Sequence, residues 1–88
     1  MPRYIIERNV GDLSQEDLEA AALRSKDALR TLKGVVWIRS YVSLKEGKIY
    51  CEYEAPSPNE ILEHARRAEL PADKISLVAA EISPEMFV

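Results

Sequence analysis

A hairpin between Gly34 and Ala55 constrains the fold of this chain more than any other segment. Its two arms are joined at Lys45-Glu46-Gly47-Lys48, where the glycine permits a tight turn. Alternation predicts one face with Val36, Ile38, Val42 and Ile49, and another with Trp37, Arg39, Tyr41, Tyr50, Glu52 and Glu54. The first face is typical of a core. The second predicts an aromatic and charged sheet surface, where we expect the function.

The segments around the hairpin predict the order strand, helix, strand, strand, helix, strand. Further strands are expected at residues 4–8 and 74–82. One helix should begin after the N-cap Ser14 and end at Lys33-Gly34, and the other should begin after the N-cap Ser57 and end before Pro71. The last strand is apolar on both sides, so both of its faces should be covered.

This order predicts an α+β fold of the ferredoxin-like βαββαβ type. Right-handed crossovers would place both helices on one face of a four-stranded antiparallel sheet, with strand order 4-1-3-2. Residues 1–88 are expected to form a single domain, because the chain is short and shows no internal linker. A second copy is the simplest cover for the open face, so we expect a homodimer through that face.

Charge and cysteine content exclude several classes of partner. The net charge is −3, which predicts no nucleic-acid binding because phosphate neutralisation requires clustered lysine and arginine. Cys51 is the only cysteine, so a reducing cytoplasm is the expected location. We expect no membrane association, because the sequence contains neither a signal-peptide core nor an apolar run of spanning length.

The carboxylates of the hairpin suggest a metal site. Glu52 and Glu54 would neighbour Glu7 of the first strand if Tyr4 and Ile6 point into the core, and clustered carboxylates attract divalent cations. In the competing interpretation, Arg39 neutralises these carboxylates across the hairpin and the ion pair only organises the dimer face. We favour the ion pair, since charge pairs on strands are common.

His64 is a second candidate metal ligand. It lies one helical turn after Glu60, so the two side chains could hold nickel or zinc from one side of the helix. However, Glu60 is expected to cap its own helix, and two ligands leave most of a coordination sphere unfilled. As a lone surface histidine, His64 would more commonly have no such role.

No residue pattern in the sequence predicts catalysis. Cys51 should be buried beside Ile49, where a thiol behaves as a small hydrophobic group. Glycine-rich phosphate loops, nucleophile elbows and paired histidines do not occur in the sequence. The chain is therefore not expected to be an enzyme.

Several short segments together resemble a known family. They are Trp37-x-x-Ser40-Tyr41-Val42, Tyr50-Cys51-Glu52-Tyr53-Glu54-Ala55-Pro56-Ser57-Pro58-x-Glu60, His64-Ala65 and Leu70-Pro71-Ala72-Asp73-x-Ile75. In order and spacing they resemble a bacterial domain-of-unknown-function family of small ferredoxin-like dimers that includes a nickel-binding protein. The resemblance implies a dimer that binds nickel or another divalent metal through nitrogen and oxygen ligands.

One position departs from the pattern that the resemblance implies. Members of the family often carry histidine in a Trp-x-His-Ser-Tyr pattern where this chain has Arg39. A guanidinium cannot ligate a cation and repels one, so the exchange opposes metal binding. His64 and the tyrosine and glutamate positions match the family and remain candidate ligands.

These observations predict a cytoplasmic homodimer that binds a divalent metal or a small ligand on the open sheet face. The predicted ligand-binding residues are Trp37, Arg39, Tyr41, Tyr50 and Glu52, and the predicted metal ligands are His64, Glu52 and Glu7. One alternative is a cofactor-poor enzyme with its active site in the dimer cleft, where Tyr41, Tyr50 or Glu52 acts as acid or base. Another is a pure interaction module whose aromatic face is filled by its twin.

Overall fold

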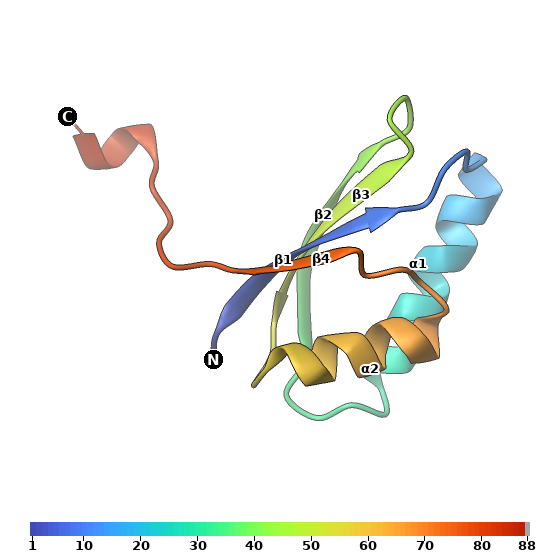
Figure 1. Ribbon diagram of the computed structural model, residues 1–88, viewed down its shortest axis with the longest axis horizontal. Coiled ribbons are helices and arrows are strands. Elements are labelled where there is room, and N and C mark those ends of the chain that lie inside the picture. The colour runs from blue at the N-terminus through green and yellow to red at the C-terminus, as the bar shows by residue number, and fades with distance from the viewer. Residues whose placement is uncertain (88) are drawn as a thin grey trace.

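The helices and strands follow the predicted order in a computed structural model that describes residues 1–87 (Figure 1). They are β1 (Arg3–Asn9), α1 (Gln15–Leu29), β2 (Val36–Ser43), β3 (Lys48–Glu54), α2 (Pro58–Ala68) and β4 (Lys74–Leu77), followed by a short 3₁₀ helix, η1 (Pro84–Phe87). The expected N-caps Ser14 and Ser57 are confirmed, and Ser14 forms a full capping box with Asp17. The first helix is shorter than predicted, because residues 30–32 continue it as tighter turns.

The four strands form one antiparallel sheet in the order β2-β3-β1-β4, which confirms the predicted topology. Both helices cover the same face of this sheet. Ser25 of α1 and His64 of α2 contact each other, and both contact Tyr53 of β3. Neither helix within residues 1–87 combines the length and apolarity that crossing a membrane requires.

A β-bulge in β2 changes which side chains face the helices. Trp37 lies opposite Tyr53, but Arg39 lies opposite Glu52, so Ile38 is an extra residue in β2. Paired residues of antiparallel strands point to the same face, and Tyr53 faces the helices. Trp37 therefore faces the helices too, and its indole stacks on Tyr53 with ring centroids 6.4 Å apart.

The predicted faces of the hairpin were therefore wrong at three positions before or at the bulge. Trp37 was expected on the open face and lies beneath the helices, whereas Val36 and Ile38 were expected in the core and lie on the open side. Simple alternation assumes an unbroken pleat, and the extra residue breaks it. The predicted faces hold for Val42, Ile49, Arg39, Tyr41, Tyr50, Glu52 and Glu54.

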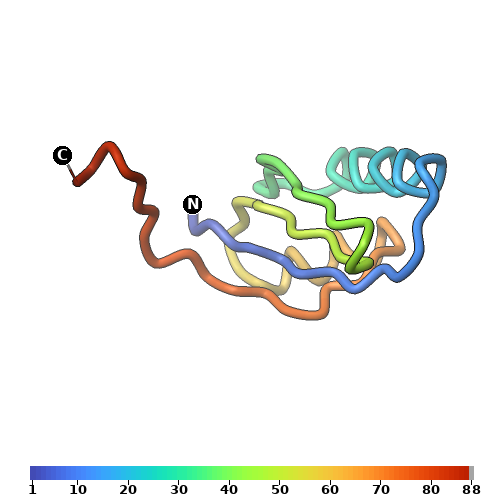
Figure 2. Tube along the Cα trace, turned by 90° about the horizontal axis from the view of Figure 1, so that it is seen from above, coloured from blue at the N-terminus to red at the C-terminus, as the bar shows by residue number. Residues whose placement is uncertain are grey.

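The last strand is shorter than predicted. β4 pairs with β1 only as far as Leu77 opposite Tyr4, and Val78 donates one further hydrogen bond to Arg3. The preceding residue, Pro2, directs its carbonyl oxygen to the β3 side instead, where it accepts a hydrogen bond from Ala55 at 3.1 Å. The chain then leaves the domain and carries η1 well away from the sheet (Figures 1 and 2). We call residues 78–87 the C-terminal arm.

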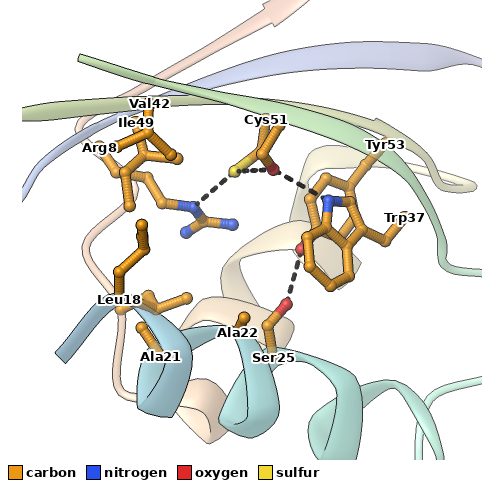
Figure 3. A pocket seen from close by; sticks show the side chains of 12 residues that line it. Arg8, Leu18, Ala21, Ala22, Ser25, Trp37, Val42, Ile49, Cys51 and Tyr53 are labelled. Atoms are coloured by element: carbon orange, nitrogen blue, oxygen red, sulfur yellow. Dashed lines mark hydrogen bonds between the residues drawn. The ribbon is translucent and has the colours of Figure 1, made fainter. Parts of the chain in front are cut away.

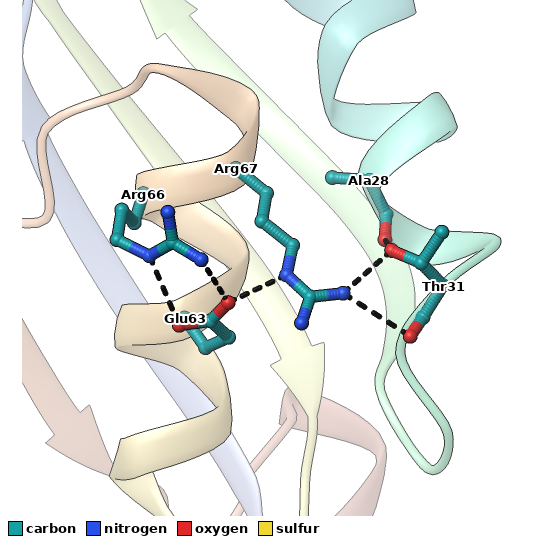
Figure 4. Close-up of polar contacts among 5 residues, drawn as sticks. All are labelled: Ala28, Thr31, Glu63, Arg66 and Arg67. Carbon is teal, nitrogen blue, oxygen red and sulfur yellow. Dashed lines mark hydrogen bonds and ion pairs between the residues drawn. The ribbon is translucent and has the colours of Figure 1, made fainter.

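A polar cluster on the outer surface ties α2 to the end of α1 (Figure 4). Glu63 accepts hydrogen bonds from Arg66 and Arg67, which lower the pKa of Glu63 to about 2. Arg67 also donates to the carbonyl and hydroxyl oxygens of Thr31, at 3.2 and 2.7 Å. Because Thr31 follows α1 directly, these contacts fix how the two helices lie beside each other.

Gly47 in the β2–β3 turn makes the closest backbone approach to the loop after β1. Its carbonyl accepts hydrogen bonds from Val10 and Gly11, at 2.9 and 3.1 Å. Its φ is +65°, and an added Cβ would lie 2.9 Å from the Cα and carbonyl oxygen of Gly11. Only glycine satisfies both the backbone angle and the contact.

We expect Gly47→Ala to destabilise the fold more than Gly11→Ala, measured by urea unfolding. Gly11 has a similar φ of +68° but nothing within 4 Å of an added Cβ, so it is a matched control. Gly11→Ala should cost about 1–2 kcal/mol from the left-handed backbone alone. Gly47→Ala should cost more, because the added Cβ would also clash with the backbone of Gly11. Equal losses would show that the contact between the two glycines contributes nothing.

Candidate functional site

The open face of the sheet carries a broad groove. This is the face on which the hairpin sequence predicted a functional site. The volume of the groove is about 810 Å³. Its walls are formed by polar and apolar residues of all four strands and of the start of the C-terminal arm. The lining residues are Arg3, Ile5, Ile38, Arg39, Tyr41, Glu52, Leu77, Val78, Ala79, Ala80 and Glu81.

An ion-pair cluster around Glu52 occupies this groove. The Glu52 carboxylate lies 3.1 Å from Arg3 Nη1 and 3.4 Å from Arg39 Nε, and its side chain is 17% exposed. Arg3 also contacts Glu81 at 2.6 Å, and this hydrogen bond is the main cause that raises the pKa of Arg3. The predicted ion pair between Arg39 and Glu52 is confirmed. Both oxygens of Glu52 therefore already have cationic partners.

Glu7 lies on the same open face, as predicted. It is opposite Tyr50 in the β1–β3 pairing, two residues along from the Ile5–Glu52 pair. Lys48 Nζ lies 3.3 Å from Glu7 Oε2, and this hydrogen bond raises the pKa of Lys48. Glu7 and Glu52 are thus near neighbours, but each is paired with a basic side chain.

His64 lies on the other side of the sheet and is fully buried, so its expected place on the surface was wrong. Its Nε2 is 3.2 Å from the Ser25 hydroxyl and 3.1 Å from the Ser25 carbonyl oxygen, and its ring packs against Tyr53. Burial lowers the pKa of His64 below its ordinary value, although the bond to Ser25 opposes this. An imidazole held this way is a neutral part of the helix–sheet interface.

The three predicted metal ligands are not brought together within one chain. His64 contacts the helical layer, whereas Glu7 and Glu52 face the opposite side of the sheet. In residues 1–87, no cluster of three or more histidine, cysteine, aspartate or glutamate side chains could hold a metal ion. A single ion cannot be shared by these three residues of one chain.

A second cavity lies between the sheet and α1, with a volume of about 240 Å³ (Figure 3). A chain of hydrogen bonds crosses its sheet wall. Trp37 Nε1 donates to the Ser40 hydroxyl at 2.9 Å, and this hydroxyl donates to Cys51 Sγ at 2.9 Å. The same sulfur accepts a bond from Arg8 Nε at 3.4 Å. Cys51 is buried, as predicted, but its surroundings are polar as well as apolar.

Sequence reasoning missed Arg8, Ser25 and Ser40 as residues of this cavity. Arg8 belongs to the inward series of β1, with Tyr4 and Ile6, and all three are buried. Alternation along the strand contains this signal, but charged residues are normally assigned to the surface. Ser40 faces inward by the same alternation as Val42, and it lies opposite Cys51.

Comparison with known proteins supplies the family. Residues 4–78 match the family model described as nickel responsive protein SCO4226-like. The chain belongs to this nickel-responsive family. The match spans every strand and both main helices, which confirms the resemblance inferred from the short segments of the sequence.

A crystal structure of SCO4226 from Streptomyces coelicolor A3(2), a protein of the nickel-responsive family, has the same fold. It covers 91% of this chain and 99% of its own chain, with a TM-score of 0.80 and 21% sequence identity. This likeness confirms the ferredoxin-like α+β architecture. No curated protein sequence matched the chain.

The family name implies nickel, but the residues of one chain do not fit a nickel site. Nickel binding requires several nitrogen, oxygen or sulfur donors that are free to converge on the ion. The candidate carboxylates Glu7 and Glu52 are paired with cations, and His64 is enclosed by Ser25 and Tyr53. Arg39 adds a positive charge beside Glu52.

The buried His64 predicts a specific pH dependence of stability. Its folded-state pKa lies below the value of about 6.5 expected in the unfolded chain, so the unfolded state takes up the proton first as pH falls. We expect the free energy of unfolding to decrease below about pH 6.5. Urea unfolding at several pH values would measure this.

His64→Gln is the control for this dependence, because it removes the titrating group and His64 is the only histidine. The variant should lose the slope between pH 5 and 6.5, whatever its overall stability. An unchanged slope in the variant would contradict the assignment.

Proposed function

We propose that the protein is a homodimeric ligand-binding member of the nickel-responsive family. In this proposal, two open sheet faces close over a shared compartment that takes a small organic anion in place of a nickel ion. The observation that carries the proposal is Arg39, which lies in the groove beside Glu52 and is 60% exposed. The single cysteine fits a reducing cytoplasm as the site of action.

Exposed apolar side chains support the dimer. Tyr41 borders the groove and is 63% exposed, and Ile5, which also lines it, is 37% exposed. The C-terminal arm adds Ile82 and Phe87, at 75% and 72%. The arm extends from the domain rather than folding over it (Figure 2). A second copy of the chain offers the groove and the arm an apolar partner.

Charge supports an anionic ligand. Arg3 is shared between Glu52 and Glu81, whereas Arg39 has one described ion pair, with Glu52 at 3.4 Å. A guanidinium with remaining donors pairs readily with a carboxylate or phosphate, and often through two parallel hydrogen bonds. A two-fold dimer would bring two copies of Arg39 into the compartment, so a dicarboxylate is a suitable probe.

The dimer is tested by analytical ultracentrifugation of Ile5→Lys. A lysine at this position places a charge in the proposed interface, while Glu52 and Ser76 on the neighbouring strands can accommodate it within one chain. We expect the natural protein to sediment as a dimer and Ile5→Lys as a folded monomer. Leu23→Lys changes a leucine on α1 that is 64% exposed, and it should leave the dimer intact. A natural protein that remains monomeric at high concentration would refute the dimer.

The choice of ligand is tested by calorimetric titration with nickel chloride and with sodium succinate. We expect the natural protein to bind succinate and not nickel, because Arg39 favours anions. Arg39→His should weaken succinate binding and gain nickel binding. Arg30→His is the control, since Arg30 lies at the end of α1 with its side chain 76% exposed. Stoichiometric nickel binding by the natural protein would overturn the proposal of an organic anion as the ligand. It would not bear on the dimer, which the ultracentrifugation experiment tests.

A further inference from the structure

Arg8 is a fully buried cation without an acidic partner. Its exposed fraction is 0%, and none of the ion pairs among residues 1–87 includes it. Nε bonds to Cys51 Sγ at 3.4 Å, and Nη1 donates to the Pro71 carbonyl oxygen at 2.7 Å. The guanidinium also lies 5.9 Å from the centre of the Tyr53 ring. Nη2 is buried and has no hydrogen-bond partner.

A buried cation without an acidic partner is unfavourable in a folded protein. Arginine stays protonated in proteins, so this charge cannot be removed by titration. An uncompensated buried charge costs several kcal/mol, and a buried donor without a partner adds to this. A sulfur is a weak acceptor and a carbonyl oxygen carries no net charge, so neither of these contacts replaces a carboxylate.

The charge lies in the wall of the cavity between the sheet and α1, and Figure 3 shows the guanidinium in the space between these two layers. Among residues 1–87, Arg8 is the only charged residue that lines this cavity. The surroundings of the guanidinium are mainly apolar or small side chains, with a few hydroxyl and sulfur groups. The other lining residues are Leu18, Ala21, Ala22, Ser25, Trp37, Ser40, Val42, Ile49, Cys51, Tyr53 and Leu70.

We propose that this cavity binds a small monocarboxylate with an apolar body, and that Arg8 Nη2 holds the carboxylate. The apolar body would pack between Leu18 and the alanines of α1 on one side and Trp37 on the other. This site lies on the opposite side of the sheet from the open-face groove, so it is independent of the function proposed above.

The size and lining of the cavity favour this class of ligand. Its volume of about 240 Å³ is below the roughly 300–1,000 Å³ of sites for drug-sized molecules, so the ligand is small. An inorganic anion would leave the apolar walls without a partner, and a neutral apolar molecule would leave Arg8 uncompensated. A monocarboxylate with an aliphatic or aromatic body satisfies both parts of the site.

Fluorescence of Trp37, the only tryptophan, provides the test because it lines the cavity. Titration with sodium hexanoate should change its emission saturably, and thermal unfolding should shift upward with hexanoate concentration. Hexanol and sodium phosphate are the control ligands. Hexanol supplies the apolar body without a carboxylate, and phosphate supplies an anion without an apolar body. We expect both to bind at least tenfold more weakly than hexanoate.

Arg8→Met removes the charge and keeps a side chain of similar shape. We expect it to raise the Kd for hexanoate roughly 10- to 100-fold, as for loss of a hydrogen bond to a charged group, and to leave hexanol binding unchanged. Its stability without ligand should be equal or higher, because a buried unpaired charge is lost. Arg24→Met is the matched control. Arg24 also donates to a backbone carbonyl, that of Ala68 at the end of α2, at 2.9 Å, but it does not line this cavity.

Ala22→Leu keeps the test decisive if Arg8→Met fails to fold. The added atoms would fill the cavity from α1, so hexanoate binding should weaken while the protein remains folded. Ala20→Leu, at an exposed position of the same helix, should bind as the natural protein does. The proposal is overturned by equal affinity for hexanoate and hexanol, by binding of phosphate alone, or by no response of Trp37 to millimolar hexanoate. Undiminished binding in Ala22→Leu would also overturn it.

Discussion

The single extra residue in β2 determines where the chemistry of this protein lies. Because Ile38 interrupts the pleat, Trp37 pairs with Tyr53 on the helical side while Arg39 pairs with Glu52 on the open side. An unbroken strand would have placed the indole and the guanidinium on one surface. The bulge instead gives the sheet two different faces, an ion-paired groove and an aromatic cavity with a buried cation.

The parts of the fold that were predictable are those encoded locally. Ser14 and Ser57 begin the helices through side-chain caps, and the strand and helix order follows from patterns within each segment. The sheet order follows from that sequence of elements through general rules of chain connection. None of these inferences requires knowledge of a particular contact between distant residues.

The site was less predictable because it depends on such contacts. The bulge is a property of the β2–β3 register, which alternation within one strand does not reveal. The burial of Arg8 and His64 depends on which side chains of α1 and β3 surround them, and polar residues are usually exposed. The ion pair of Arg39 with Glu52 was predictable because the hairpin brings these residues together directly.

The description of the family suggests a role for nickel, whereas the ion pairs of the open-face carboxylates oppose metal binding within one chain. The family model covers residues 4–78, but in one chain Glu52 is already paired with Arg3 and Arg39, and Glu7 with Lys48. A fold can be shared while its site changes, since one substitution at the centre of a site can reverse the charge it attracts. Arg39 lies in the groove beside Glu52, where it adds a positive charge.

The buried guanidinium of Arg8 has a consequence for the lifetime of the protein in a cell. Proteases and chaperones act on the unfolded fraction, and a difference of one or two kcal/mol changes protein abundance several-fold. An occupant that compensated this charge would favour the folded chain, whereas chains without it would be degraded sooner. The cellular amount of the protein would then depend on the supply of that occupant, without any change in transcription.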